Sequence, residues 1–223
     1  MSSGHWVGYI GNFQVHYDTL ITMWAAMAFI IVVSFLLTRN LQIIPTKGQA
    51  ISEKIMDFFL DALKGIKNGE KHIPLIGSLF LFILFANLMG QLPLKLFHLK
   101  QGEFASPTND LNMTAAMAIV VLIYYLFEGF KNKGLHAIFH GFTVDGIIET
   151  LIDFLDMVTR PLSLSLRLFA NIYAGEILVF AITSIFAFFA PIPIMLFEVF
   201  VAFVQAYVFM LLSIAYISTM QKE

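Results

Sequence analysis

The sequence predicts an all-α integral membrane protein, with about five membrane helices and one amphipathic helix at the membrane interface. Of its 223 residues, 59% are hydrophobic and only 13% are charged, whereas charged residues make up roughly 25% of an average soluble domain. The apolar residues also gather in long uncharged runs, of which residues 20–37 form the first. A helix of about 20 apolar residues spans the hydrocarbon core of a bilayer, so these runs are long enough to cross it.

Composition also excludes several classes of function. The formal net charge is -2, which gives no basic excess for binding nucleic acid. Cysteine is absent, so disulfides, thiolate metal ligands and a cysteine nucleophile are excluded. The chain contains no phosphate-binding Walker loop, no Gly-x-Gly-x-x-Gly and no serine-nucleophile motif. We therefore expect no catalytic site and no cofactor in this chain.

The histidines do not form a metal-binding pattern. Only His136 and His140 have helical spacing, and no acid stands beside them. Because a zinc site needs three or four converging ligands, we expect surface histidines and no bound metal. The six histidines are His5, His16, His72, His98, His136 and His140.

The first membrane helix is predicted over residues 20–38, after an N-terminal tail of residues 1–19. Lys and Arg are absent before it and frequent after it. Because cytoplasmic loops carry an excess of these cations, we expect the tail outside and the following segment in the cytoplasm. The tail also lacks the basic start of a cleavable signal peptide, so we expect this helix in the mature protein. The cations after the helix are Arg39, Lys47, Lys54, Lys64, Lys67 and Lys71.

The cytoplasmic segment contains a predicted amphipathic helix over residues 48–68. Ile55, Phe59 and other apolar side chains recur on one face, while Lys54 and Asp57 belong to the opposite face. A helix with this pattern lies along the membrane interface more readily than across the bilayer.

Two further membrane helices are predicted over residues 74–95 and 109–128. In the first, Gly77 favours close helix packing and Asn87 adds a polar group. Residues 108–110, Thr-Asn-Asp, offer good N-cap chemistry for the second. The loop between these helices carries only Lys95 and Lys100, while Lys131 and Lys133 follow the second helix, which supports the same orientation.

The last two helices are predicted over residues 143–190 and 193–220, as a long tilted hairpin. Residues 145–189 would extend about 67 Å at 1.5 Å per residue, whereas the hydrocarbon core is about 30 Å thick. The first helix must therefore tilt steeply, bend at Pro161 or begin at the cytoplasmic surface. Pro191 and Pro193 then make the turn, which returns the C-terminus to the cytoplasm. No internal repeat is evident, which gives inverted-repeat transporters little support.

The first helix of this hairpin carries a polar stripe, with polar side chains at every third or fourth position. Such a stripe can line water. A charge in a membrane-spanning helix costs roughly 3 kcal/mol, so Arg167 needs a partner or water. Glu176 is nine residues away on the opposite face, so we expect the partner outside this chain. Asp156 and Arg160, at i and i+4, are equally well explained as an interfacial salt bridge. The stripe comprises Glu149, Asp153, Asp156, Arg160, Ser163, Arg167 and Asn171.

A second polar group is predicted near the outer side of the hairpin. Glu176 and Glu198 each lie roughly a dozen residues from the turn, which places them at similar depth in antiparallel helices. Gln205 and Tyr216 share a face with Glu198. Two poorly solvated carboxylates suit groups that accept and release protons. The alternative is that these residues are hydrogen-bonded packing groups.

Residues 166–176, Leu-Arg-Leu-Phe-Ala-Asn-Ile-Tyr-Ala-Gly-Glu, strongly resemble subunit a of the membrane sector of F-type ATP synthase. The resemblance extends to residues 74–82, 87–93, 107–112 and 205–212, and so covers most of the chain after the first helix. It implies a stator that beds against a rotating ring of c subunits and offers each ring carboxylate two offset half-channels. Proton flow is thereby coupled to ATP synthesis. The implied partners are the c ring, the b subunits of the peripheral stalk, the remaining ATP synthase and the lipid bilayer.

The resemblance also assigns roles to single residues. Arg167 matches the essential arginine that faces the ring, and Asn171 and Gln205 match its polar neighbours. Glu176 matches an acid of the outer half-channel. Glu198 stands where some relatives have His.

The inner half-channel is assigned partly from the resemblance and partly from the polar stripe. Asp153 falls where relatives commonly have an acid of this channel, and we expect Glu149 and Ser163 on the same face to help line it. Mitochondrial relatives usually carry His where Glu176 stands, so the resemblance favours a bacterial plasma (inner) membrane. The choice between H+ and Na+ rests largely on the ring.

Two other classes of function give different expectations. A self-contained secondary transporter would use Arg167 as an anion-substrate site, and its purified chain would transport alone. A membrane enzyme would need a cluster of metal ligands or a nucleophile, which the sequence does not offer.

Overall fold

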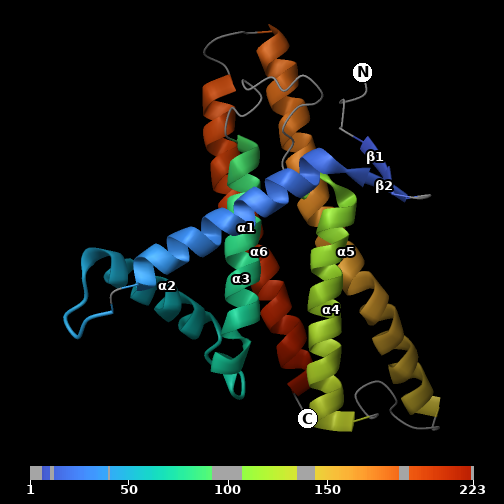
Figure 1. The fold of residues 1–223 in the computed structure, drawn as a ribbon. Coiled ribbons are helices and arrows are strands. Elements are labelled where there is room, and N and C mark those ends of the chain that lie inside the picture. Colours follow the sequence, from blue (N-terminus) through green and yellow to red (C-terminus); the bar gives the residue numbers. More distant parts are fainter. Residues whose placement is uncertain are drawn as a thin grey trace.

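The computed structural model describes residues 7–10, 13–39, 41–91, 107–134, 144–185 and 191–221. Six helices account for most of this part of the chain (Figure 1). They are α1 Tyr17–Thr38, α2 Lys47–Ala62, α3 Ile73–Gln91, α4 Leu111–Lys133, α5 Val144–Ile185 and α6 Pro191–Gln221. Short 3₁₀ helices, η1 Gly69–His72 and η3 Pro107–Asn109, precede α3 and α4.

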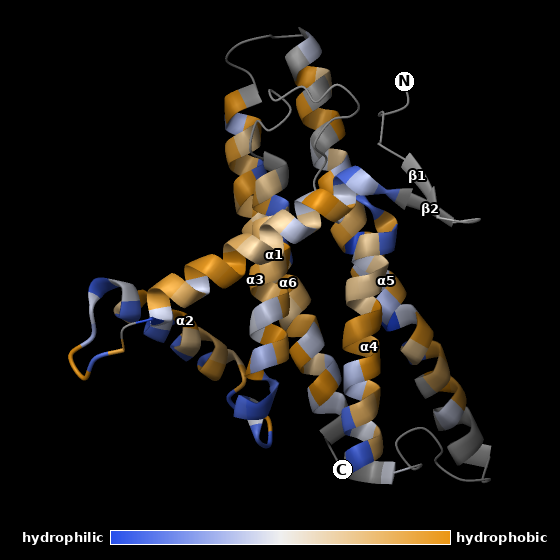
Figure 2. Ribbon diagram, viewed as in Figure 1, coloured by the Kyte–Doolittle hydropathy of each residue, from blue (hydrophilic) through white to orange (hydrophobic). Residues whose placement is uncertain are grey.

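Among the described residues, five stretches are long and apolar enough to cross a membrane, so the predicted fold class is confirmed. They are Tyr17–Thr38, Gly69–Met89, Leu111–Lys131, Thr150–Val179 and Ile192–Thr219. Figure 2 shows their hydrophobic surfaces, and it shows hydrophilic residues gathered at η1 and at the start of α2. The helix α2 is amphipathic, as the sequence indicates.

A small hairpin lies in the segment expected to be an N-terminal tail. Strands β1 Val7–Ile10 and β2 Phe13–His16 pair antiparallel, from Val7 opposite His16 to Ile10 opposite Phe13. The second strand leads directly into α1, because Tyr17 follows His16. The hairpin therefore holds His16 beside the first turn of α1.

Local sequence explains several helix ends. The Thr46 hydroxyl accepts from the Gln49 N–H at the start of α2, and the Asp110 carboxylate accepts from the Asn112 N–H at the start of α4. The predicted N-cap at residues 108–110 is thus confirmed. Helix α2 ends at Ala62 rather than at residue 68, because Gly65 and Asn68 have φ of 99° and 55°. Such left-handed residues interrupt a right-handed helix.

The core lies where α3, α4, α5 and α6 meet, and α2 covers one side of it. Buried residues from these helices include Phe59, Ile83, Val121, Leu168 and Phe209. The predicted close packing at Gly77 is confirmed: a Cβ there would lie 3.3 Å from the Phe59 ring. The neighbouring rings form an aromatic cluster that joins α2, α3 and α6. Its members are Phe58, Phe59, Phe80, Phe203 and Tyr207.

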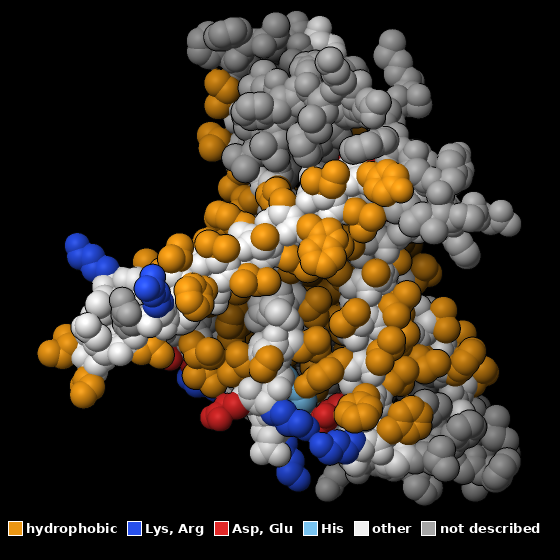
Figure 3. All heavy atoms as spheres, viewed as in Figure 1, with side chains coloured by type: hydrophobic (Ala, Val, Ile, Leu, Met, Phe, Trp, Pro, Cys, Tyr) orange, Lys and Arg blue, Asp and Glu red, His pale blue; other side chains and the backbone are white. Residues whose placement is uncertain are grey.

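Helix α1 crosses α3 obliquely and stands apart from the rest of the bundle (Figure 1). Phe29 meets Phe85 of α3 edge to face, with ring centroids 5.2 Å apart. Most of its other large apolar side chains are exposed, and Figure 3 shows apolar side chains along the length of this helix. A helix with so little burial and so little polarity fits contact with lipid or with another membrane helix.

Helices α5 and α6 form a hairpin whose turn, residues 186–190, lies outside the described residues. The helical ends near this turn rise beyond the ends of α3 and α4 (Figure 1). The 42-residue helix α5 continues through Pro161 instead of ending there, and it runs obliquely beside α4. The described start of α6 is Pro191, a favoured residue for the first turn because the missing N–H needs no partner there.

Candidate functional site

Arg167 lies on the exposed face of α5, in the middle of its membrane-length stretch. Ser163, Ala170 and Ala174 are exposed on the same helix, whereas Leu164 and Leu168 are buried against the bundle. Within the described side chains, no ion pair or hydrogen bond is formed by Arg167. A full positive charge is therefore presented with small side chains one turn before and after it, while the large side chains of Leu166 and Tyr173 are exposed nearby in the sequence.

Two amides are expected from the sequence to be polar neighbours of this arginine. Asn171, one turn further along α5, is half-buried. Gln205 comes from α6 and is buried, and its Nε2 has no hydrogen-bond partner among the described groups. A buried amide without a partner costs free energy unless water or another group satisfies it. The amide of Gln205 is thus suited to a polar path.

The α5–α6 hairpin brings Glu198 against the backbone beside Glu176. Glu198 is buried, and a Cβ added at Gly175 would lie only 2.6 Å from its Oε1. Because glycine has no side chain, position 175 leaves room for the Glu198 carboxylate. Glu176 is the next residue of α5, although its side chain lies outside the described residues. Glu176 and Glu198 are expected at similar depth, and the backbone agrees, because Glu198 lies against the residue before Glu176.

The two acids expected near the start of α5 are Glu149 and Asp153. Both lie in α5, but their side chains are outside the described residues. Fourteen residues separate Asp153 from Arg167 in sequence, which is about 21 Å along a helix. Both acids are thus placed by the helix well away from the middle of its membrane-length stretch.

The polar stripe of α5 is not one uniform surface. Arg160 Nη2 lies 2.6 Å from Asp156 Oδ2, so these two residues form an i,i+4 salt bridge. Its guanidinium also lies over the ring of Tyr216, 5.1 Å from the centroid. Arg160 is half-buried, whereas Arg167 is exposed. The two arginines therefore do not share one polar surface as expected, because the Arg160 side chain contacts Tyr216 of α6 whereas that of Arg167 is exposed.

Polar pairs also mark the end of the bundle where α3 begins and α4 ends. Lys71 Nζ lies 3.0 and 3.2 Å from the two carboxylate oxygens of Glu128. His72 Nδ1 lies 2.8 Å from the Tyr124 hydroxyl. The expectation of a surface histidine is wrong for His72, which is completely buried because Tyr124 supplies a polar partner inside the bundle. These pairs connect distant parts of the sequence, which spacing alone does not reveal.

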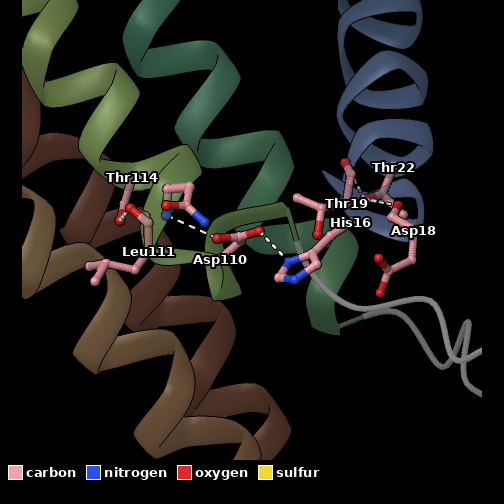
Figure 4. Close-up of polar contacts among 8 residues, drawn as sticks. His16, Asp18, Thr19, Thr22, Asp110, Leu111 and Thr114 are labelled. Atoms are coloured by element: carbon pink, nitrogen blue, oxygen red, sulfur yellow. Dashed lines mark hydrogen bonds and ion pairs between the residues drawn. The ribbon is translucent and has the colours of Figure 1, made fainter. Parts of the chain in front are cut away.

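The opposite end of the bundle carries another polar cluster (Figure 4). His16 Nδ1 lies 2.8 Å from Asp110 Oδ2, which ties the N-terminal hairpin to the start of α4. On α1, the Thr22 hydroxyl donates to the backbone oxygens of Asp18 and Thr19, at 3.0 Å each. Among the described residues, no group of three or more His, Cys, Asp or Glu could hold a metal.

Asn87 is a polar group whose environment the sequence did not reveal. It is fully buried in α3, and neither its amide nitrogen nor its oxygen has a hydrogen-bond partner among the described groups. The sequence does show an amide within an apolar membrane helix, which is a signal for a functional polar group, but it does not show what surrounds that amide.

Comparison with known proteins gives consistent similarities. A family model described as "ATP synthase A chain" matches residues 20–218. The chain is also 38% identical over 216 residues to a protein of Gloeobacter violaceus described as "ATP synthase subunit a". That alignment covers 96% of this chain and 87% of the relative. Both similarities therefore include the α5–α6 hairpin and the site described above.

Proposed function

The chain belongs to the ATP synthase A chain family, and from that premise we propose that Arg167 is its contact with a ring of c subunits. The chain is a proton-conducting, non-catalytic subunit of the membrane sector of F-type ATP synthase, and it acts there as a stator. What remains to be assigned is how its own residues carry the proton and meet the ring.

The observation that carries the proposal is the environment of Arg167. Its charge lies at membrane depth on an exposed helix face, without an ion-pair partner among the described side chains. Insertion of such a charge costs roughly 3 kcal/mol. The small neighbours Ser163 and Ala170 allow another helix to approach closely. A carboxylate on a neighbouring chain would offset the cost of this charge.

The outer half-channel leads from one membrane surface to this arginine past Glu176 and Glu198. Buried Glu198 lies against Gly175, next to Glu176 in the chain. Gln205 lies seven residues further along α6, about two helical turns. These groups can receive a proton and pass it toward a ring carboxylate.

The inner half-channel begins at the other end of α5. Asp153 and Glu149 lie there in the helix, and Ser163 is exposed closer to Arg167. We place this end in the cytoplasm and His16 outside, because Lys and Arg concentrate after α1 and after α4. The membrane is a bacterial plasma membrane, and the remaining partners include the b subunits of the peripheral stalk.

The fixed charge of Arg167 accounts for coupling. A deprotonated ring carboxylate is attracted to the guanidinium as it passes, and a proton cannot cross the same point directly because like charges repel. A proton that enters one half-channel must therefore ride around the ring to reach the other. Each charge that crosses 100 mV releases roughly 2.3 kcal/mol, so several protons are pooled for one ATP.

The proposal is tested by replacing Arg167 in the assembled ATP synthase. Arg167→Lys keeps the charge but loses the planar fork that stays protonated when desolvated, so we expect ATP-driven pumping to be abolished. Arg167→Ala should also abolish pumping, and it should let protons leak between the half-channels because the electrostatic barrier is removed. Vesicles with a pH-sensitive dye measure both pumping and leak.

Arg39→Ala is a matched control, since Arg39 is an exposed arginine just after α1. We expect normal pumping from it. Normal pumping in both Arg167 variants would contradict the proposal. So would transport by the purified chain without a c ring, which is the expectation for a self-contained transporter.

A further inference from the structure

Arg160 stands at a weak point of the longest helix. Pro161 follows it inside α5, and proline has no N–H to donate to the carbonyl of Met157, four residues earlier. Helices bend most readily at such a residue. The angle between the two parts of α5 therefore depends on contacts made around Pro161.

Those contacts come from three helices. The Arg160 guanidinium is 2.6 Å from the Asp156 carboxylate and lies 5.1 Å from the centroid of Tyr216 on α6. The Tyr216 ring in turn lies 6.1 Å from the ring of Tyr125 on α4. Tyr125 is only 1% exposed, and the Arg160 side chain only 18%. We call these four residues the Arg160 clamp.

The clamp is close enough to Arg167 to affect its position. Seven residues separate the two arginines, which is about 10 Å along the helix and nearly two full turns. A change of about 20° in the bend at Pro161 would move Arg167, about 9 Å further along the helix, sideways by about 3 Å. Misplacement by about 1 Å can slow a reaction by about 100-fold when the reacting groups must meet closely.

We infer that the Arg160 clamp is a positioning device, which sets the bend at Pro161 and so places Arg167 against the c ring. The inference rests on the proposed function, because it takes Arg167 as the ring contact. Arg160 needs no partner outside the chain, since Asp156 neutralises its charge and Tyr216 covers its planar face. The Tyr125 ring packs against the Tyr216 ring. The clamp therefore fixes α5 to α6 and α4 at the one place where its backbone is least constrained.

The test uses the whole ATP synthase, with a cysteine at Ala170 and single cysteines along the ring helix that carries the carboxylate. The chain has no cysteine of its own, so its disulfides with the ring report only this position. Tyr216→Leu removes the stacking ring, Arg160→Gln removes the charge, and Tyr216→Phe keeps the ring while losing the hydroxyl.

We expect Tyr216→Leu and Arg160→Gln to assemble, to lower ATP-driven pumping about 10-fold or more, and to shift the strongest cross-link to other ring positions. Tyr216→Phe should keep both the pumping and the cross-link pattern, because the aromatic face remains. Phe127→Leu is the control: it also replaces an aromatic ring by leucine, but this exposed residue of α4 belongs neither to the Arg160 clamp nor to the aromatic cluster, so we expect an unchanged pattern.

Unchanged cross-links in Tyr216→Leu and Arg160→Gln would overturn the inference, whether or not pumping falls. Failure of both variants to assemble would overturn it too, because a positioning device is not needed for assembly. If cysteine at 170 forms no disulfide with any ring position in the otherwise unchanged complex, the proposed function itself fails. The two failures are therefore distinguishable.

Discussion

Arg160 and Arg167 lie two turns apart on one helix, yet their environments are opposite. Arg160 has an ion-pair partner at 2.6 Å and an aromatic ring over its face, and it is half-buried. Arg167 is exposed, with small side chains one turn before and after it, and pairs with none of the described carboxylates. The first is satisfied by its own chain, whereas the second has the environment from which we propose a contact with another molecule.

The difference shows how to separate structural charges from functional ones in a membrane helix. Both arginines would be equally costly in lipid without partners, so hydropathy does not distinguish them. Intrachain partners do, because they identify the charge that the fold already accommodates. Four predictions use this distinction, in order of the size of the expected effect.

The largest difference is expected between two single variants of the assembled complex, each of which removes one of the two arginine charges. Arg167→Gln should lower ATP-driven pumping at least 100-fold, because the ring carboxylate loses its counter-charge. Arg160→Gln should lower it about 10-fold, because Arg167 is displaced but retained. Pumping per assembled complex measures both. Equal losses in the two variants would remove the distinction.

The second prediction concerns a charge pair held inside the chain. Lys71→Ala leaves the Glu128 carboxylate, only 6% exposed, without the cation 3.0 Å from its Oε1, and we expect the free energy of unfolding to fall. Lys64→Ala is the control, because Lys64 and Asp61 are largely exposed and such pairs contribute little to stability. Denaturant unfolding in mixed micelles gives both values. A Lys71 variant as stable as the control would contradict the prediction.

A smaller effect is expected at Glu198, whose carboxylate is confined by the backbone of α5. Gly175→Ala places a methyl group only 2.6 Å from Glu198 Oε1, so the carboxylate must shift. We expect passive proton flux through the assembled membrane sector to fall about 10-fold, with normal assembly. Ala116→Ser adds one atom on the exposed face of α4 and should leave the flux unchanged. Equal flux in the two variants would separate Glu198 from the path.

The smallest effect is expected at Tyr125, the innermost member of the Arg160 clamp. Its hydroxyl is buried and has no hydrogen-bond partner among the described groups. Tyr125→Phe removes a polar atom that costs free energy to bury, so stability should stay the same or rise by up to about 1 kcal/mol. Tyr125→Leu should lower it, because the ring contact with Tyr216 is lost. A destabilised Tyr125→Phe variant would reveal a partner for the hydroxyl.

The helices could be predicted from the sequence because each carries a local signal. Long apolar runs mark α1, α3 and α6, and Asp110 caps α4 at the expected place. The hairpin before α1 was missed, since its two short strands lie in a tail with no strong alternation. The early end of α2 depends on left-handed backbone at Gly65 and Asn68, which composition does not specify.

The site was predictable to the extent that it depends on single residues at membrane depth. Arg167 is costly in a membrane helix without a partner, and Glu176 lies on the opposite face, so hydropathy and helical spacing together make it a candidate site residue. The divided stripe was not predictable, because Tyr216, which holds Arg160, comes from 56 positions further along the chain. The pairs of Lys71 with Glu128 and of His72 with Tyr124 likewise depend on how α3 packs on α4.

The aromatic cluster described in the fold has a mechanical consequence. In the proposed function, a ring that turns against Arg167 pulls sideways on α5, and an elastic support would absorb part of each step as deformation. Phe80 of α3 touches rings from both α2 and α6, and close-packed interiors are hardly compressible. The cluster therefore packs α6 tightly against α2 and α3. Helix α5 in turn contacts α6. Torque that reaches α6 is resisted by stiff packing, so little of the work done by each proton is lost as strain.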